Sequence, residues 1–151
     1  MKRSFVGALA TIGTLLFGSA LRAEDGPKHP HMHHALHELK ETRTELKEAK
    51  HDFGGHREKA LLAVDAAIKQ IKIALKDSGD EYQGAKPDKD VYKEYKHHPH
   101  LHHAIHELKE ARTELKEAKH NFGGHREAAL KDVDYAIEQL ELALKYAKPK
   151  K

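Results

Sequence analysis

The 151-residue sequence contains no cysteine and no tryptophan, and only 6% of its residues are aromatic. The absence of cysteine excludes disulfide bonds, thiolate metal ligands, lipid attachment through a thiol and covalent c-type haem attachment. A fold built from this sequence must therefore be held together by packing and non-covalent contacts alone.

The N-terminal segment has the three parts of a secretory signal peptide. Lys2 and Arg3 precede an uncharged apolar run over residues 5–17, and small residues follow this run. The run is thirteen residues long, short of the ~20 residues that a membrane-spanning helix needs. We therefore expect cleavage after Ala20 or Ala23 and a periplasmic or secreted mature chain without stable membrane insertion. An uncleaved membrane anchor is the alternative.

An excess of charge of one sign is also missing once this segment is removed. Three of the 27 basic residues lie within the segment, whereas all 24 acidic residues lie from Glu24 onward. A chain that starts at Glu24 therefore has 24 basic and 24 acidic residues. Nucleic-acid binding depends on a basic field, so no nucleic-acid partner is expected. The fifteen histidines add positive charge only below about pH 6.

What the sequence does have is an internal repeat. Residues 29–76 align without a gap with residues 98–145, and only twelve of the 48 aligned positions differ. Both copies contain His-Pro-His-x-His-His-Ala-x-His-Glu-Leu-Lys near their start and Phe-Gly-Gly-His-Arg-Glu in their middle. A recent duplication leaves the same closeness, so shared residues are not thereby functional.

Each copy has the apolar periodicity of two helices. In each copy, apolar residues at three-, four- and seven-residue steps form one stripe before a glycine pair and another after it. The stripes comprise Leu36, Leu39, Leu46, Ala49 and Phe53, then Leu61, Val64, Ile68, Ile71 and Leu75 in the first copy, and Ile105, Leu108, Leu115, Ala118 and Phe122, then Leu130, Val133, Ile137, Leu140 and Leu144 in the second. Because glycine accepts positive φ at a helix end, the pairs Gly54–Gly55 and Gly123–Gly124 predict antiparallel helical hairpins.

Neither hairpin can cover its own stripes, so the predicted fold is all-α, with two tandem hairpins docked as a four-helix bundle. The predicted organisation is a signal peptide over 1–23, hairpin repeat 1 over 24–76, a polar linker over 77–97 and hairpin repeat 2 over 98–151. The open end of each hairpin is the end where its first helix begins and its second helix ends. If the linker joins two neighbouring open ends, which is the simplest topology, both repeats start at the same end of the bundle. An extended coiled-coil dimer is the alternative, and the glycine pairs disfavour it.

Eleven of the fifteen histidines lie at the starts of the two first helices. On a helical wheel with Leu39 at the centre of the core stripe, His33, His34 and His37 lie on the solvent side. Imidazoles four residues apart on an exposed helix form a chelate for Cu²⁺, Ni²⁺ or Zn²⁺, and histidines beside the entrance prolines could complete the coordination. The predicted metal ligands are His29, His31, His33, His34 and His37 in the first repeat, and His98, His100, His102, His103 and His106 in the second.

These ligands predict a non-enzymatic protein that buffers or sequesters divalent transition metals outside the cytoplasm. Cu²⁺ is favoured over Ni²⁺ and Zn²⁺ by intrinsic affinity. No nucleophile–base pair and no phosphate-binding glycine loop is visible in the sequence. Two alternatives stay open: a helical interaction or scaffold module of the cell envelope with histidines as pH sensors, and non-covalent haem binding by paired histidines.

The histidines beside the glycine turns have a different expected role. His56 and His125 are expected to make structural hydrogen bonds at the turn, although metal binding by them and by His51 and His120 stays open. The heads of Arg57 and Arg126 are expected to reach the last carbonyls of the preceding helix. The spacing Glu48-x-x-His51, repeated in the second copy, matches di-iron bundles, but the wheel points both residues away from the core, which disfavours such a centre.

The turn segment Asp52-Phe53-Gly54-Gly55-His56-Arg57-Glu58-Lys59-Ala60-Leu61 resembles the signature of a family of small exported bacterial helical-hairpin proteins with a Gly-Gly-His-Arg turn. That resemblance covers both hairpins and implies the hairpin fold and export, but no activity. In its composition, hairpin repeats and lack of cysteine, the chain is also similar to periplasmic His-rich small metal-binding proteins associated with copper. The clustering of its histidines at helix starts departs from that pattern.

Overall fold

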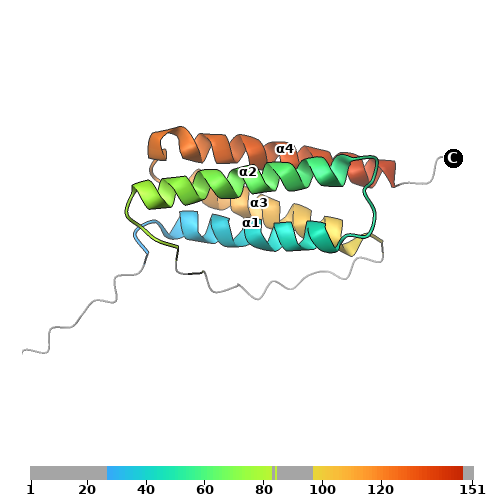
Figure 1. Cartoon of the computed structure of the whole chain (residues 1–151), viewed down its shortest axis with the longest axis horizontal. Helices are drawn as coiled ribbons and strands as arrows, with labels where there is room; N and C mark the ends of the chain where they lie inside the picture. The colour runs from blue at the N-terminus through green and yellow to red at the C-terminus, as the bar shows by residue number, and fades with distance from the viewer. Residues whose placement is uncertain (1–26, 83, 85–96, 148–151) are drawn as a thin grey trace, which may run out of the picture.

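The computed structural model describes residues 27–82, 84 and 97–147, which form four α-helices and one 3₁₀ turn (Figure 1). The elements are α1 (Pro30–Glu48), α2 (His56–Asp77), α3 (Pro99–Glu117), η1 (Phe122–Gly124) and α4 (His125–Tyr146). The predicted all-α four-helix bundle is confirmed. The predicted signal peptide over 1–23 lies outside the described residues, as does most of the predicted linker over 77–97.

The helices begin and end where proline and glycine direct the backbone. Pro30 and Pro99 occupy the first positions of α1 and α3, where the missing N–H costs no helical hydrogen bond. Before α2, Phe53, Gly54 and Gly55 have φ values of 55°, 69° and 84°. The two glycines adopt this left-handed region without steric cost. Phe53 is held in the same region because its side chain is buried in the core. This turn folds α2 back along α1.

The two hairpins dock antiparallel to each other. α1 packs mainly on α3, and α2 packs mainly on α4. His31 at the start of α1 contacts Glu114 near the end of α3, while His100 at the start of α3 contacts Glu45 near the end of α1. The hairpins are therefore related by an approximate two-fold axis, and the starts of α1 and α3 lie at opposite ends of the bundle (Figure 1).

The prediction that both histidine-rich helix starts share one end of the bundle is therefore wrong. The simplest topology assumed that the connection between the repeats joins adjacent open ends. The connection over residues 78–98 reaches ~70 Å when extended, whereas a 19-residue helix such as α1 spans ~28 Å. It is thus long enough to lead from one end of the bundle to the other.

A single aliphatic core runs through the bundle. Most residues of the predicted stripes are buried in it, and the remaining ones pack against it partly exposed, namely Leu61, Ile105, Phe122, Leu130 and Leu144. Met32 and Leu101, which lie outside the predicted stripes, are also buried. Docking of the two hairpins stripe to stripe is thus confirmed. Among the described residues, no helix has both the length and the apolar character needed to cross a membrane.

Two polar contacts repeat in both halves and tie the turns in place. Arg57 Nη1 donates to the carbonyl oxygen of Leu46 at 2.9 Å, and Arg126 Nη1 donates to that of Leu115 at 3.1 Å, as the sequence predicts. The turn histidines reach further than expected. His56 Nδ1 lies 2.9 Å from Gln139 Oε1. His125 Nδ1 lies 2.7 Å from Gln70 Oε1. Their partners belong to the other hairpin, so these histidines connect the two repeats instead of closing their own turns.

Candidate metal sites

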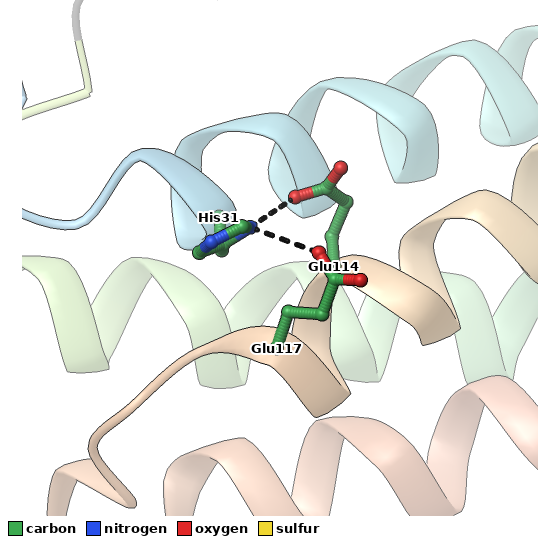
Figure 2. Close-up of side chains that lie close together, drawn as sticks. All are labelled: His31, Glu114 and Glu117. Carbon is green, nitrogen blue, oxygen red and sulfur yellow. Dashed lines mark hydrogen bonds and ion pairs between the residues drawn. The ribbon is translucent and has the colours of Figure 1, made fainter.

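One group of potential metal ligands lies where the first turn of α1 meets the last turn of α3. His31 Nδ1 is 2.8 Å from Glu114 Oε2 and 3.6 Å from Glu117 Oε2 (Figure 2). Glu114 and Glu117 are three residues apart, so both side chains leave the same face of α3. The three ligand atoms lie within 4.8 Å of one another. We call this group the His31 site.

The approximate two-fold axis produces a second group of the same composition at the other end of the bundle. His100 Nδ1 is 2.7 Å from Glu45 Oε2 and 3.9 Å from Glu48 Oε2. Each of these residues occupies the repeat position equivalent to a member of the His31 site, at the same offset of 69 residues. We call this group the His100 site. Both sites combine an imidazole of one hairpin with two carboxylates of the other.

A second histidine stands beside each site. His34 Nδ1 lies 3.7 Å from Glu114 Oε2, and His103 Nδ1 lies 3.7 Å from Glu45 Oε2. Zinc binds imidazole nitrogen and carboxylate oxygen at ~2.0–2.2 Å, which separates neighbouring ligands of a tetrahedral ion by ~3.3–3.6 Å. The His–Glu separations within the two groups run from 2.7 to 3.9 Å, so the shortest, which is a hydrogen bond, must lengthen by about half an ångström for both atoms to bind one ion. Each site therefore offers one imidazole and two carboxylates as a compact group, with the second histidine close to one of these carboxylates.

The surroundings of both sites favour a cation. The two carboxylates occupy the last turn of a helix, where the helix dipole is negative, and the neighbouring helix start offsets this only in part. The side chains remain accessible, since His31 is 40% exposed and Glu117 is 57% exposed. An ion can therefore reach and leave each site without opening the bundle.

His33 lies in a different environment from the one that the helical wheel predicts. Its side chain is only 2% exposed, its ring stacks on Tyr82 at 5.6 Å between centroids, and its Nε2 lies 3.2 Å from Asp80 Oδ2. This approach has the distance of an ion pair but not the geometry of a hydrogen bond. Asp80 also accepts a hydrogen bond from the backbone N–H of His29 at 2.9 Å. The expectation that His33 faces solvent is wrong, because the segment after α2 folds over this face of α1.

The equivalent residue of the second repeat, His102, is less buried than His33. The repeat position equivalent to Asp80 is Pro149, and His102 remains partly exposed. Burial lowers the pKa of the His102 imidazole, and the neighbouring His98 and His103 lower it further. Its neutral form is therefore favoured.

The other predicted ligands divide between the turns and the helix surface. The ring of His29 packs edge-on against Phe122 at 4.8 Å between centroids, and that of His98 packs in the same way against Phe53 at 5.0 Å. His37 and His106 lie further along their helices, outside the two sites. The structure thus places four of the ten predicted histidines beside the glutamates of the two sites, namely His31, His34, His100 and His103.

The carboxylate ligands are the residues that sequence reasoning missed. Glu45 and Glu48, with Glu114 and Glu117, form a Glu-x-x-Glu pattern at the end of each first helix. This pattern is the sequence signal for the carboxylate ligands. It indicates a metal site only if α1 and α3 run antiparallel, because the glutamates then lie next to the histidines of the other repeat. The spacing of Glu48 and His51 matches a di-iron motif. In the structure Glu48 lies instead beside the histidine of the other repeat.

The fold and the sites together define a class, a four-helix bundle of two repeated hairpins with a His/Glu group of possible metal ligands at each end of the α1–α3 contact. A comparison with protein-family models, with curated proteins and with solved structures finds no match. The resemblance of the turn segment to exported helical-hairpin proteins therefore stays a prediction.

Proposed function

We propose that the protein reversibly binds divalent transition metal ions at the His31 and His100 sites and buffers or sequesters them. The observation that carries the proposal is the convergence of one histidine and two glutamates from different repeats, whose ligand atoms lie within 4.8 Å of one another in each group. A single exposed His–Glu contact is common on protein surfaces. The second site follows from the duplication and the two-fold docking, so the support comes from the composition of each group, in which one imidazole and two carboxylates from different hairpins converge.

The donor chemistry narrows the class of ion. Imidazole suits copper, nickel and zinc, while carboxylates add the oxygen ligands that zinc also accepts. On intrinsic affinity, Cu²⁺ binds such a site more strongly than Ni²⁺ or Zn²⁺. We therefore propose Cu²⁺ as the preferred ion, with Ni²⁺ and Zn²⁺ binding the same sites more weakly. The signal-like N-terminal segment supports a role outside the cytoplasm.

Calorimetric titration with Cu²⁺, Ni²⁺ and Zn²⁺ tests the proposal. The wild-type chain is expected to bind two ions at about pH 7.5 and to release them at about pH 5.5, as the histidines become protonated. The double variant Glu114→Gln/Glu117→Gln is expected to leave one ion bound. The double variant Glu45→Gln/Glu48→Gln is expected to have the same effect at the other site. The variant with all four substitutions is expected to bind neither ion.

The matched control is the double variant His37→Gln/His106→Gln. It removes two histidines of the same helices that lie outside the sites, so two ions should still bind. If the fourfold Glu→Gln variant binds metal as tightly as the wild-type chain, the proposal is wrong. Loss of binding in the control alone would assign the metal to histidine pairs along the helix surface instead. Circular dichroism of each variant verifies that the helices are retained.

A further inference from the structure

The two repeats have diverged mainly on one surface. The first helices, α1 and α3, differ at three positions, which are all buried or packed against the core, namely Met32/Leu101, Leu36/Ile105 and Thr42/Ala111. Over residues 56–76 and their equivalents the second helices differ at eight positions. At two of these the charge is reversed on exposed residues, Lys69/Glu138 and Lys72/Glu141. The outward faces of α2 and α4 have therefore become electrostatically different.

On the first repeat the result is a basic groove between α1 and α2. The groove has a volume of about 390 Å³ and is lined by Arg43, Asp65, Ile68, Lys69, Lys72, Ile73 and Lys76. Its one acidic residue, Asp65, already pairs with Arg43 at 2.7 Å. Burial lowers the pKa of the nearby Lys40, and the charge of Lys72 lowers it further. Lys69, Lys72 and Lys76 are three and four residues apart along α2, so an approaching anionic surface would relieve the repulsion among them.

On the second repeat the equivalent surface is not basic. Glu138 and Glu141 replace the two lysines and are exposed on α4. The Arg43–Asp65 pair recurs as Arg112–Asp134 at 3.2 Å, so this part of the lining is conserved while the two lysines of α2 are replaced in α4. We call the exposed surface around Glu138 and Glu141 the acidic face.

The basic groove and the acidic face point away from each other. The two hairpins lie side by side, with α1 next to α3 and α2 next to α4. The α1–α2 and α3–α4 grooves must therefore lie on opposite sides, related by the approximate two-fold axis. One molecule cannot bring its own two surfaces together, but two molecules can.

We propose that the basic groove of one copy of this chain docks against the acidic face of a second copy, with Lys69 and Lys72 facing Glu138 and Glu141. The contact joins unlike surfaces, so each docked pair keeps one free groove and one free acidic face and can add further copies. Charge complementarity between the surfaces supports the second copy as the occupant. The contact is independent of metal binding.

Sedimentation velocity with a chelator present tests this inference separately from the metal sites. The wild-type chain is expected to associate at about 20 mM salt and to dissociate at about 500 mM salt, where the charges are screened. The variants Lys69→Glu/Lys72→Glu and Glu138→Lys/Glu141→Lys should each be monomeric at low salt, with dissociation constants raised about tenfold or more. Every substitution places at one repeat the residue already present at the other, so the bundle should fold.

The decisive measurement mixes the two variants. The first carries two acidic surfaces and the second two basic ones, so each fails to bind itself while the mixture is expected to associate again. A wild-type chain that stays monomeric at low salt would overturn the proposal, and so would a mixture that stays monomeric. If the monomeric wild-type chain instead bound vesicles containing phosphatidylserine through Lys69 and Lys72, the groove would belong to a lipid surface and the proposal would be wrong.

Discussion

The start of α1 and the start of α3 have nearly the same sequence but different surroundings. In α1 the segment after α2 covers the helix start, with Asp80 beside His33 and Tyr82 stacked on its ring. In α3 the equivalent His102 stays partly exposed. His31 and His100, only two residues earlier, have matching partners at matching distances.

This comparison shows that a repeated motif has a repeated environment only where its neighbours are repeated as well. The glutamates next to His31 and His100 belong to the duplicated helices, so the two sites are alike. Asp80 and Tyr82 belong to the connection, which occurs once. The two halves should therefore respond alike to changes in the core and in the sites, and differently to changes at the connection.

The largest expected effect is in the core, where the halves should agree. Leu39 and Leu108 are equivalent and fully buried. Replacing either one with Ala should lower the free energy of unfolding by ~2–5 kcal/mol, because lost burial and a cavity add. Chemical denaturation of both variants checks this. A difference above ~1 kcal/mol between them would show that the two halves are packed less alike than the structure indicates.

A smaller effect is expected where the halves differ. Asp80→Ala removes the acceptor of the His29 N–H and leaves His33 buried without a neighbouring carboxylate, at an expected cost of ~1–3 kcal/mol. The exposed Asp77 serves as the control, and its replacement by Ala should change stability by less than ~0.5 kcal/mol. Metal stoichiometry should not change, since Asp80 belongs to neither site. Unchanged stability in Asp80→Ala would mean that the cover over α1 is energetically unimportant.

The smallest effect concerns Asp132, whose equivalent in the first repeat is Ala63. Burial raises the pKa of the Asp132 carboxyl above its ordinary value of 3.8. The folded state therefore holds this proton more tightly than the unfolded chain, so ionisation at neutral pH destabilises the fold, and the cost disappears as the pH falls below the unfolded pKa.

Asp132→Ala should thus raise the melting temperature at neutral pH by no more than ~2 °C, and this gain should shrink on acidification. Asp132→Asn, which removes the charge and keeps the shape, should show the same pH dependence without the added helix propensity of Ala. A gain that is equal at all pH values in both variants would contradict the assigned cause.

The sequence was sufficient to predict each hairpin but not how the hairpins face each other. Apolar periodicity and the glycine pairs specify helices and turns locally, and the reach of Arg57 to the end of α1 follows from the same local geometry. The connection over residues 78–98 is long enough for either orientation. Glu114 and Glu117 could therefore not be recognised as partners of His31 before the antiparallel docking was known.

The burial of His33 escaped prediction for a related reason. The helical wheel places His33 by its angle from the apolar stripe centred on Leu39. This treatment assumes that only one neighbouring helix covers α1. In the bundle, α1 contacts α3 as well as α2, and the segment after α2 adds further cover, so a wider arc of the helix is buried. A residue about a third of a turn from the centre of the stripe then lies inside.

The division of each site between two hairpins has a further consequence. No hairpin carries a complete ligand group, so two separate hairpins would have to meet in solution before either group could form. The connection turns that encounter into an event within one molecule, at an effective concentration on the order of millimolar. Dilution to the nanomolar range would scatter unlinked hairpins, yet in the tandem chain it leaves both ligand groups assembled.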